Sequence, residues 1–256
     1  MRSTIIVALL SISLSAMAQF KPIPSGPIHW ADLPVNKSAD REGRKFLEGT
    51  TSEFSYFEIH ASTQYKGASP RPPHAQTDIE ELIFVKDGTL KFTMGTMSRT
   101  LGKGSVILIP PHQMQAIENV GDGPLTYYVI MFRAKKGMDM DRSAKAGGPL
   151  MLNADSLVYT PSAKGGGIKY FERPTAMLDK LELHITELKS KGPSHAPHTH
   201  IDTELILVLQ GDVEITIDGT SYTATAGDIC LINSNQMHAI SNSQDAPSKY
   251  LAVRWK

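Results

Sequence analysis

The sequence is poor in cysteine and has no excess charge of either sign. Cys230 is the only cysteine among 256 residues, so an internal disulfide is excluded. Lys plus Arg and Asp plus Glu both number 26, which gives no support for nucleic acid or an anionic membrane as a partner. Cys230 lies in the apolar run GDICLI. We therefore expect a small buried hydrophobic side chain there rather than a nucleophile.

Long hydrophobic runs are missing as well, and membrane insertion is not expected. An apolar stretch at residues 5–14 is too short to span a bilayer as a stable helix. It lies between Arg2 and the small-x-small sequence AMA at residues 16–18, which is the layout of a secretory signal peptide. We expect residues 1–18 to be cleaved before Gln19 and the protein to be exported, either periplasmic or secreted.

Three blocks of sequence occur twice in the same order. The second copy of each block lies 123 or 124 residues after the first. Three blocks in register predict two copies of one domain. The pairs are KFLEGTTSEFSYFEIH with KYFERPTAMLDKLELH, ELIFVKDG with ELILVLQG, and GSVILIPPHQMQAIEN with GDICLINSNQMHAISN. We place the first domain at residues 19–132 and the second at residues 151–256, joined by a charged, glycine-containing linker at residues 133–150.

Alternating apolar and polar residues predict strands within each copy. In DKLELHITEL, leucine and isoleucine alternate with glutamate, histidine and threonine, which is the period of a strand. Asp218-Gly219 between alternating runs is a strong hairpin signal. Helical periodicity is nearly absent, so we predict an all-β fold, an antiparallel sandwich or barrel. His184 and its repeat counterpart His60 lie opposite the Leu/Ile face, and we expect them on the exterior or between the domains, with a position lining the pocket as the alternative.

The stretch HTHIDTE is the clearest candidate site. Residues two apart in a strand share a face, so His198 and His200 project together, and Glu204 keeps the same parity. Imidazole with carboxylate suits a divalent Mn, Fe, Co, Ni, Cu or Zn ion. A fourth donor must come from elsewhere in the sequence, and the last repeated block contains His238.

With these residues the sequence resembles the cupin superfamily. The pattern G-x5-H-x-H-x3-E-x6-G at residues 192–211 fits the first cupin motif without a gap. The pattern G-x5-N-x-N-x2-H-x3-N at residues 227–242 fits the second in spacing. Both copies match, so the chain looks like a bicupin, which implies two tandem jelly-roll β-barrels after the signal peptide. The resemblance also implies that one divalent transition metal is bound in the C-terminal barrel, with His198, His200, Glu204 and His238 as its ligands.

The first copy departs from this pattern. Gln76 and Gln115 stand where the motif has histidine, and an amide oxygen is a weaker donor than imidazole nitrogen. Strand parity favours Glu80 as the carboxylate, whereas counting back from the turn glycine favours Glu81, which we prefer because the turn sets the register. The N-terminal barrel then has no metal or a weak second site at His74, Gln76, Glu81 and Gln115. An amide site for a hard metal or a substrate is the alternative.

The resemblance implies a metal-dependent enzyme of dioxygenase, isomerase or lyase type. It would act on a small oxygenated substrate in the C-terminal barrel, and no residue is assigned as a catalytic acid or base. The order Glu-x-His-x3-His, expected of a ureidoglycine-type enzyme, is absent from PHTHIDTE, and the incomplete first site weakens an oxalate decarboxylase-like function. The alternative is a non-catalytic cupin that contains a metal and binds a small molecule or a sugar. Cupins often pair, so the resemblance also allows a homodimer.

Overall fold

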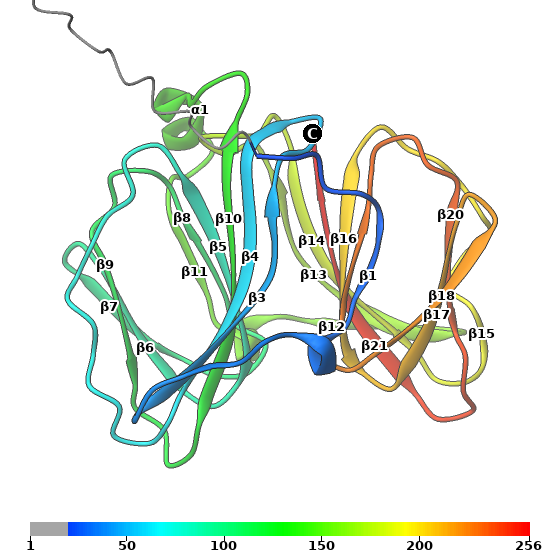
Figure 1. Cartoon of the computed structure of the whole chain (residues 1–256), viewed down its shortest axis with the longest axis horizontal. Helices are drawn as coiled ribbons and strands as arrows, with labels where there is room; N and C mark the ends of the chain where they lie inside the picture. Colours follow the sequence, from blue (N-terminus) through cyan, green and yellow to red (C-terminus); the bar gives the residue numbers. More distant parts are fainter. Residues whose placement is uncertain (1–19) are drawn as a thin grey trace, which may run out of the picture.

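The computed structural model describes residues 20–256, and the expected signal peptide lies outside them. As predicted, the regular secondary structure of the described chain is almost entirely strand (Figure 1). Its helical segments are short: η1 (Trp30–Asp32), α1 (Met140–Lys145) and η2 (Ala154–Ser156). Among the described residues, no helix is long and apolar enough to cross a membrane.

The N-terminal half contributes most strands of one seven-stranded sheet and all of a three-stranded sheet. The large sheet has the order β11-β8-β5-β10-β4-β3-β2 and the small one β7-β6-β9. The strands are β2 (Asn36–Lys37), β3 (Arg41–Gly49), β4 (Phe54–Gln64), β5 (Glu80–Asp87), β6 (Leu90–Met94), β7 (Met97–Leu101), β8 (Val106–Ile109), β9 (Gln115–Asn119), β10 (Leu125–Ala134) and β11 (Leu150–Leu152).

The C-terminal half repeats this arrangement. Its seven-stranded sheet has the order β1-β19-β16-β21-β14-β13-β12, and its smaller sheet has the order β15-β20-β17-β18. The strands are β1 (Gly26–Ile28), β12 (Tyr159–Ser162), β13 (Gly165–Arg173), β14 (Leu181–Leu188), β15 (Gly192–Pro193), β16 (Thr203–Gln210), β17 (Asp212–Ile217), β18 (Thr220–Thr225), β19 (Ile229–Ile232), β20 (His238–Asn242) and β21 (Ser248–Trp255).

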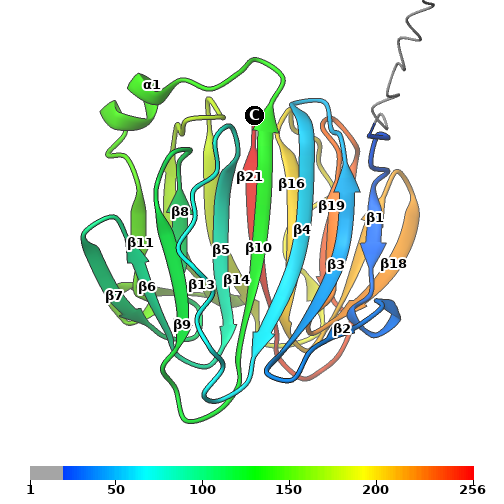
Figure 2. The same cartoon turned by 60° about the vertical axis from the view of Figure 1, so that its left-hand side comes forward.

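The two large sheets pack against each other in the middle of the molecule, and the two small sheets lie on the outside (Figures 1 and 2). One apolar core joins the domains and contains side chains of β4 and β10 together with side chains of β14 and β21. Phe54, Phe132 and Trp255 stack there, with 5.0 Å between the two phenylalanine rings and 5.6 Å from Phe54 to Trp255. Each domain has its own second core between its large and small sheets.

These cores correct the expectation for His60 and His184. The Leu/Ile face of β14 lies in the core between the domains. Because strand residues alternate, His184 faces the interior of its own domain, and His60 lines the cavity of the first domain. The expectation of an exterior or inter-domain position was wrong because both faces of each large sheet are buried. The apolar face packs against the other domain, and the more polar face, which carries the histidines, lies inside its own domain.

Two strands pair across the predicted division of the chain. β1, placed in the first domain, adds to the second domain's sheet through β19, with Pro27 opposite Cys230. β11 adds to the first domain's sheet through β8, with Met151 opposite Ile107. The predicted boundaries do not anticipate this exchange. Cys230 is fully buried, as expected, and burial raises the pKa of its thiol to about 12.

Asp228 connects the segment that contains β1 to the second domain through hydrogen bonds. Its carboxylate lies 2.8 Å from His29 Nδ1 and accepts hydrogen bonds from the backbone N–H groups of Trp30 and Thr225 at 2.8 and 2.9 Å. Changing Asp228 to Ala removes a buried carboxylate and leaves the partly buried N–H groups of Trp30 and Thr225 without this acceptor. We therefore expect the free energy of unfolding, measured by urea denaturation, to fall by about 1–3 kcal/mol.

Hydrogen exchange should also accelerate across residues 26–30 in this variant, because β1 would be held less firmly. Asp245→Ala removes a carboxylate from an exposed loop and serves as the control, with little effect on either measurement. Unchanged stability and unchanged exchange in Asp228→Ala would contradict this role.

Candidate metal centre

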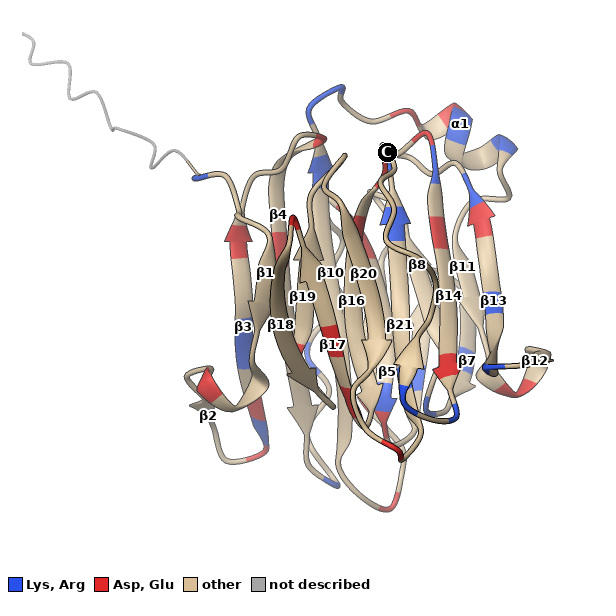
Figure 3. Cartoon of the chain, turned by 90° about the vertical axis from the view of Figure 1, so that its right-hand side faces the viewer, with Lys and Arg blue, Asp and Glu red and all other residues tan. Residues whose placement is uncertain are grey.

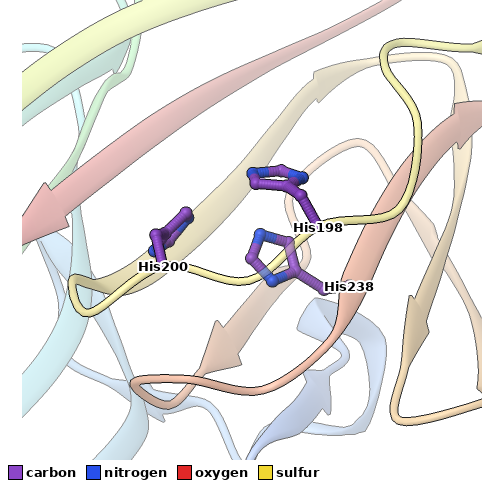
Figure 4. Close-up of side chains that lie close together, drawn as sticks. All are labelled: His198, His200 and His238. Carbon is purple, nitrogen blue, oxygen red and sulfur yellow. The ribbon is translucent and has the colours of Figure 1, made fainter.

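Two loops of the second domain bring three imidazoles together. His198 and His200 precede β16, and His238 is the first residue of β20. The backbones of His198 and His238 form a two-way bridge, with N–H to carbonyl distances of 3.0 and 2.9 Å. One ring nitrogen from each of the three side chains lies within 4.8 Å of the others. Figure 4 shows the three rings gathered around a common space.

Local turn chemistry places His238 at this point. The hairpin predicted at Asp218-Gly219 is present, and both residues have positive φ, 47° and 83°, as a tight hairpin turn requires. The Asp218 carboxylate accepts hydrogen bonds from the Met237 N–H at 2.9 Å and from the Gln236 amide at 2.8 Å. The β17–β18 turn therefore holds the loop that ends at His238.

Glu204 completes the group predicted from the motif. Its Oε2 atom lies 3.2 Å from Nε2 of His200 and 3.2 Å from Nε2 of His238. Burial would raise the pKa of Glu204, but the adjacent imidazoles of His200 and His238, when they are protonated, hold it well below its usual range. The structure thus brings the four predicted ligands of the second domain into one partly buried cluster.

In His200 and His238, the ring nitrogen that faces away from Glu204 forms a hydrogen bond with the backbone. Nδ1 of His200 lies 2.9 Å from the Asp202 carbonyl, and Nδ1 of His238 lies 2.9 Å from the Gln236 carbonyl. Carbonyl oxygens only accept, so each Nδ1 carries its hydrogen and, in the neutral ring, leaves the Nε2 lone pair directed toward Glu204.

This donor set fits a divalent cation. Lone pairs on two imidazoles face a carboxylate, an arrangement that a positive ion between them would stabilise. Nδ1 of His198 and Nε2 of His238 are buried and have no hydrogen-bond partner among the described residues. Buried polar atoms normally have a partner, and a metal would supply one here. The mixture of nitrogen and oxygen donors matches borderline transition metals.

Asp202 supports this cluster, and the motif did not identify it. Its carbonyl oxygen orients His200, while its carboxylate pairs with Lys180 at 2.7 Å and with Arg254 at 3.0 Å. Lys180 also pairs with Glu182 at 3.1 Å. The sequence DKLELHITEL contained a hint of this charged group, because Lys180 and Glu182 lie on the same face of the strand as His184.

In the first domain, amide groups take the place of the histidines. Gln76 donates a hydrogen bond to Oε1 of Glu81 at 2.8 Å, and Gln115 donates one to Oε2 at 2.5 Å. His74 is exposed and forms the same two-way backbone bridge with Gln115 that His198 forms with His238. The predicted weak-site residues therefore lie together, but both oxygens of the carboxylate already have a donor.

Glu80 and Glu81 point to opposite sides of β5. Glu81 lines the cavity of the first domain. Glu80 is fully buried against the second domain, where its carboxylate accepts hydrogen bonds from the Thr175 hydroxyl at 2.6 Å and the Met177 N–H at 3.0 Å. Burial raises the pKa of Glu80. The structure thus places Glu81, the residue preferred from the turn glycine, beside Gln76 and Gln115.

Comparison with known proteins defines the class. The family model described as Cupin domain matches residues 62–131 and 184–254, which together make up more than half of the chain. The chain therefore belongs to the cupin family and carries two tandem cupin domains, so the resemblance to bicupins is confirmed. No curated protein matches the sequence.

Solved structures share the fold at low sequence identity. The Ylba protein of E. coli is 15% identical with a TM-score of 0.67, over 90% of each chain. AerE of Microcystis aeruginosa is 12% identical with a TM-score of 0.67, over 91% of this chain and 99% of that one. An oxalate decarboxylase of Lactobacillus farciminis, solved as a formate complex, is 12% identical with a TM-score of 0.70, over 91% of this chain and 86% of that one. At these identities the likeness shows the fold alone.

Proposed function

We propose that this chain is an exported bicupin metalloprotein whose second domain is a metal-dependent enzyme. The ligands would be His198, His200, Glu204 and His238, inside a jelly-roll barrel of the kind found in cupins. The substrate would be a small oxygenated molecule, and the reaction of dioxygenase, isomerase or lyase type. The observation that carries the proposal is the convergence of three imidazoles and one buried carboxylate, with two of the ring nitrogens lacking a hydrogen-bond partner within residues 20–256.

A divalent transition metal that favours five or six ligands would supply a Lewis acid in this site, with positions left for a substrate oxygen. The residues around the site have separate tasks. Asp202 orients His200 through its carbonyl group. His184 faces the interior of the same domain, and burial lowers the pKa of its imidazole. A histidine that stays neutral at pH 7 can accept a proton from a substrate hydroxyl.

The proposed activity can be tested with a metal and substrate screen. The purified chain, loaded in turn with Mn, Fe, Co, Ni, Cu and Zn, would be assayed for oxygen uptake and product formation with phenols, diketones and uronates. At least one combination of metal and substrate should give turnover. The rate of that reaction should fall by about 10³-fold or more in His200→Ala, because Lewis-acid stabilisation of several kcal/mol is lost.

Lys191→Ala is the control for this screen, since Lys191 is exposed in the loop before the motif and its loss should leave the rate unchanged. Turnover that survives in His200→Ala would place the chemistry elsewhere. Binding of the same compounds without turnover would favour the alternative, a non-catalytic cupin that contains a metal and holds a small molecule or a sugar.

A further inference from the structure

The first domain contains a cavity of about 230 Å³ that the proposed metal chemistry does not use. His60, Ser62 and Gln64 alternate along β4 and face into it, opposite Tyr127 and Val129 of β10. This volume is below the range of about 300–1,000 Å³ that is typical of pockets for drug-sized ligands. The occupant would therefore be a small molecule.

Gln64 lines this cavity and has one buried atom without a hydrogen-bond partner among the described residues. Gln64 is 3% exposed, and its amide Nε2 donates to the Tyr127 hydroxyl at 3.2 Å. Its carbonyl Oε1 is buried and has no partner among the residues that the structure describes. A buried acceptor without a donor destabilises the protein, so a hydroxyl or amine of a ligand would satisfy it.

A free positive charge lies at the same place. Arg71 is exposed, lines the cavity, and makes no ion pair within residues 20–256. A neighbouring cavity of about 170 Å³ shares Arg71, Gln64, Ser62 and Tyr127 with the first. Burial raises the pKa of Tyr127, and the positive charges of Arg71 and Arg41 oppose that rise. The guanidinium group of Arg71 therefore lies near the Tyr127 hydroxyl, to which the Gln64 amide donates a hydrogen bond.

Glu81, the carboxylate inside the cavity, forms no ion pair with Arg71 in the described part of the chain. Both oxygens of Glu81 accept amide hydrogen bonds, from Gln76 and Gln115. A guanidinium group without an internal partner is suited to a ligand carboxylate, which it can bind through two parallel hydrogen bonds.

The second domain lacks this pair of groups. At the repeat offset of 124 that relates His74 to His198, Arg71 corresponds to His195 and Gln64 to Leu188. His195 packs edge-on against His198, with 4.4 Å between the ring centroids, so the equivalent position in the second domain lies beside the imidazole cluster. The pair of Arg71 and Gln64 is therefore particular to the first domain.

We propose that the cavity of the first domain binds a small hydroxylated carboxylate without a metal. Arg71 binds the carboxylate, and Gln64 Oε1 accepts a hydrogen bond from a hydroxyl group of the same molecule. This site is separate from the metal cluster of the second domain and does not depend on the function proposed for it.

The test uses the full chain, stripped of metal with a chelator, and three probes of equal carbon number. Glycerate has a carboxylate and hydroxyls, propionate has only the carboxylate, and glycerol has only hydroxyls. Calorimetric titration should give about one equivalent of glycerate per chain. Propionate and glycerol should each bind at least about 10-fold more weakly, because each lacks one of the two polar contacts.

Variants assign the two contacts. Arg71→Gln should weaken glycerate binding at least about 10-fold, because a charge-assisted contact is lost, and this exposed position should tolerate the change without unfolding. Gln64→Leu should remove the preference for glycerate over propionate. Lys66→Gln is the matched control, since Lys66 is an exposed cation of the same loop paired with Asp122, and it should bind glycerate as the parent does.

Three results would overturn the proposal. They are no glycerate binding to the metal-free chain, equal binding in Arg71→Gln, and loss of binding in the double variant His198→Ala/His200→Ala. The last would place the ligand in the second domain. Conversely, binding that persists in that double variant supports this site whether or not the second domain proves to be an enzyme.

Discussion

Changing both His198 and His200 to alanine is expected to reduce the metal content of the protein from about one ion per chain to nearly none. The double variant keeps only His238 and Glu204 as donors in the cluster. Loss of a group that merely orients a ligand already costs roughly 10–100-fold in metal affinity, so loss of two ligands should cost considerably more. Elemental analysis of the purified, dialysed proteins measures the effect directly.

The matched control is Thr199→Ala, because Thr199 lies between the two histidines and is exposed. This variant should keep its metal. The parent should also lose thermal stability on addition of a chelator, since a bound ion stabilises the folded state, and the double variant should show no such loss. A parent protein with two ions per chain, or with none, would contradict a single site in the second domain.

Introducing histidine at Gln76 and Gln115 together is expected to create a second metal site in the first domain. These positions correspond to His200 and His238, and the backbone bridge between the two loops is the same in both domains. The substitution replaces two amide donors that now bond to Glu81 with two imidazole nitrogens, which are better ligands for borderline metals. Metal content should rise from about one to about two ions per chain.

Gln76→Asn with Gln115 unchanged keeps an amide at the same place and is the control, with no gain of metal. The two single histidine variants should gain little, because each leaves one amide bonded to Glu81. If the double variant still holds one ion, the first domain lacks a preorganised site, and the difference between the domains extends beyond these two side chains.

The parts of the structure that could be predicted from the sequence are those set by local pattern. Alternation along DKLELHITEL gave strands, and the Asp218-Gly219 pair gave a hairpin. The turn at Gly88 explains why counting residues back from this glycine correctly identified Glu81, and not Glu80, as the carboxylate that lies beside Gln76 and Gln115. Gly88 has φ of 86°, and a Cβ atom there would lie 2.5 Å from the Pro124 carbonyl oxygen. The chain is therefore fixed at this turn, and the strand register follows from it.

The parts that could not be predicted depend on which surface each strand face meets. The alternation of residues predicts that His184 and Leu183 lie on opposite faces of their strand, but it does not predict that the apolar face packs against the other domain. Arg71 and Gln64 come from a loop and from a strand with no motif between them, and only the folded chain brings them to one cavity. The pairing of β1 with β19 joins residues about two hundred positions apart, for which no local signal exists.

That pairing has a consequence for the order in which the protein is made. β1 is among the first segments to leave the ribosome, yet its partner strand β19 is among the last. Until then the segment has no sheet to join, and long-range pairing of this kind is intrinsically slow. A shortened chain that began after residue 28 would leave the outer edge of β19 with free N–H and C=O groups, and such an edge recruits strands from other molecules. The first strand therefore protects the newly made second domain from self-association.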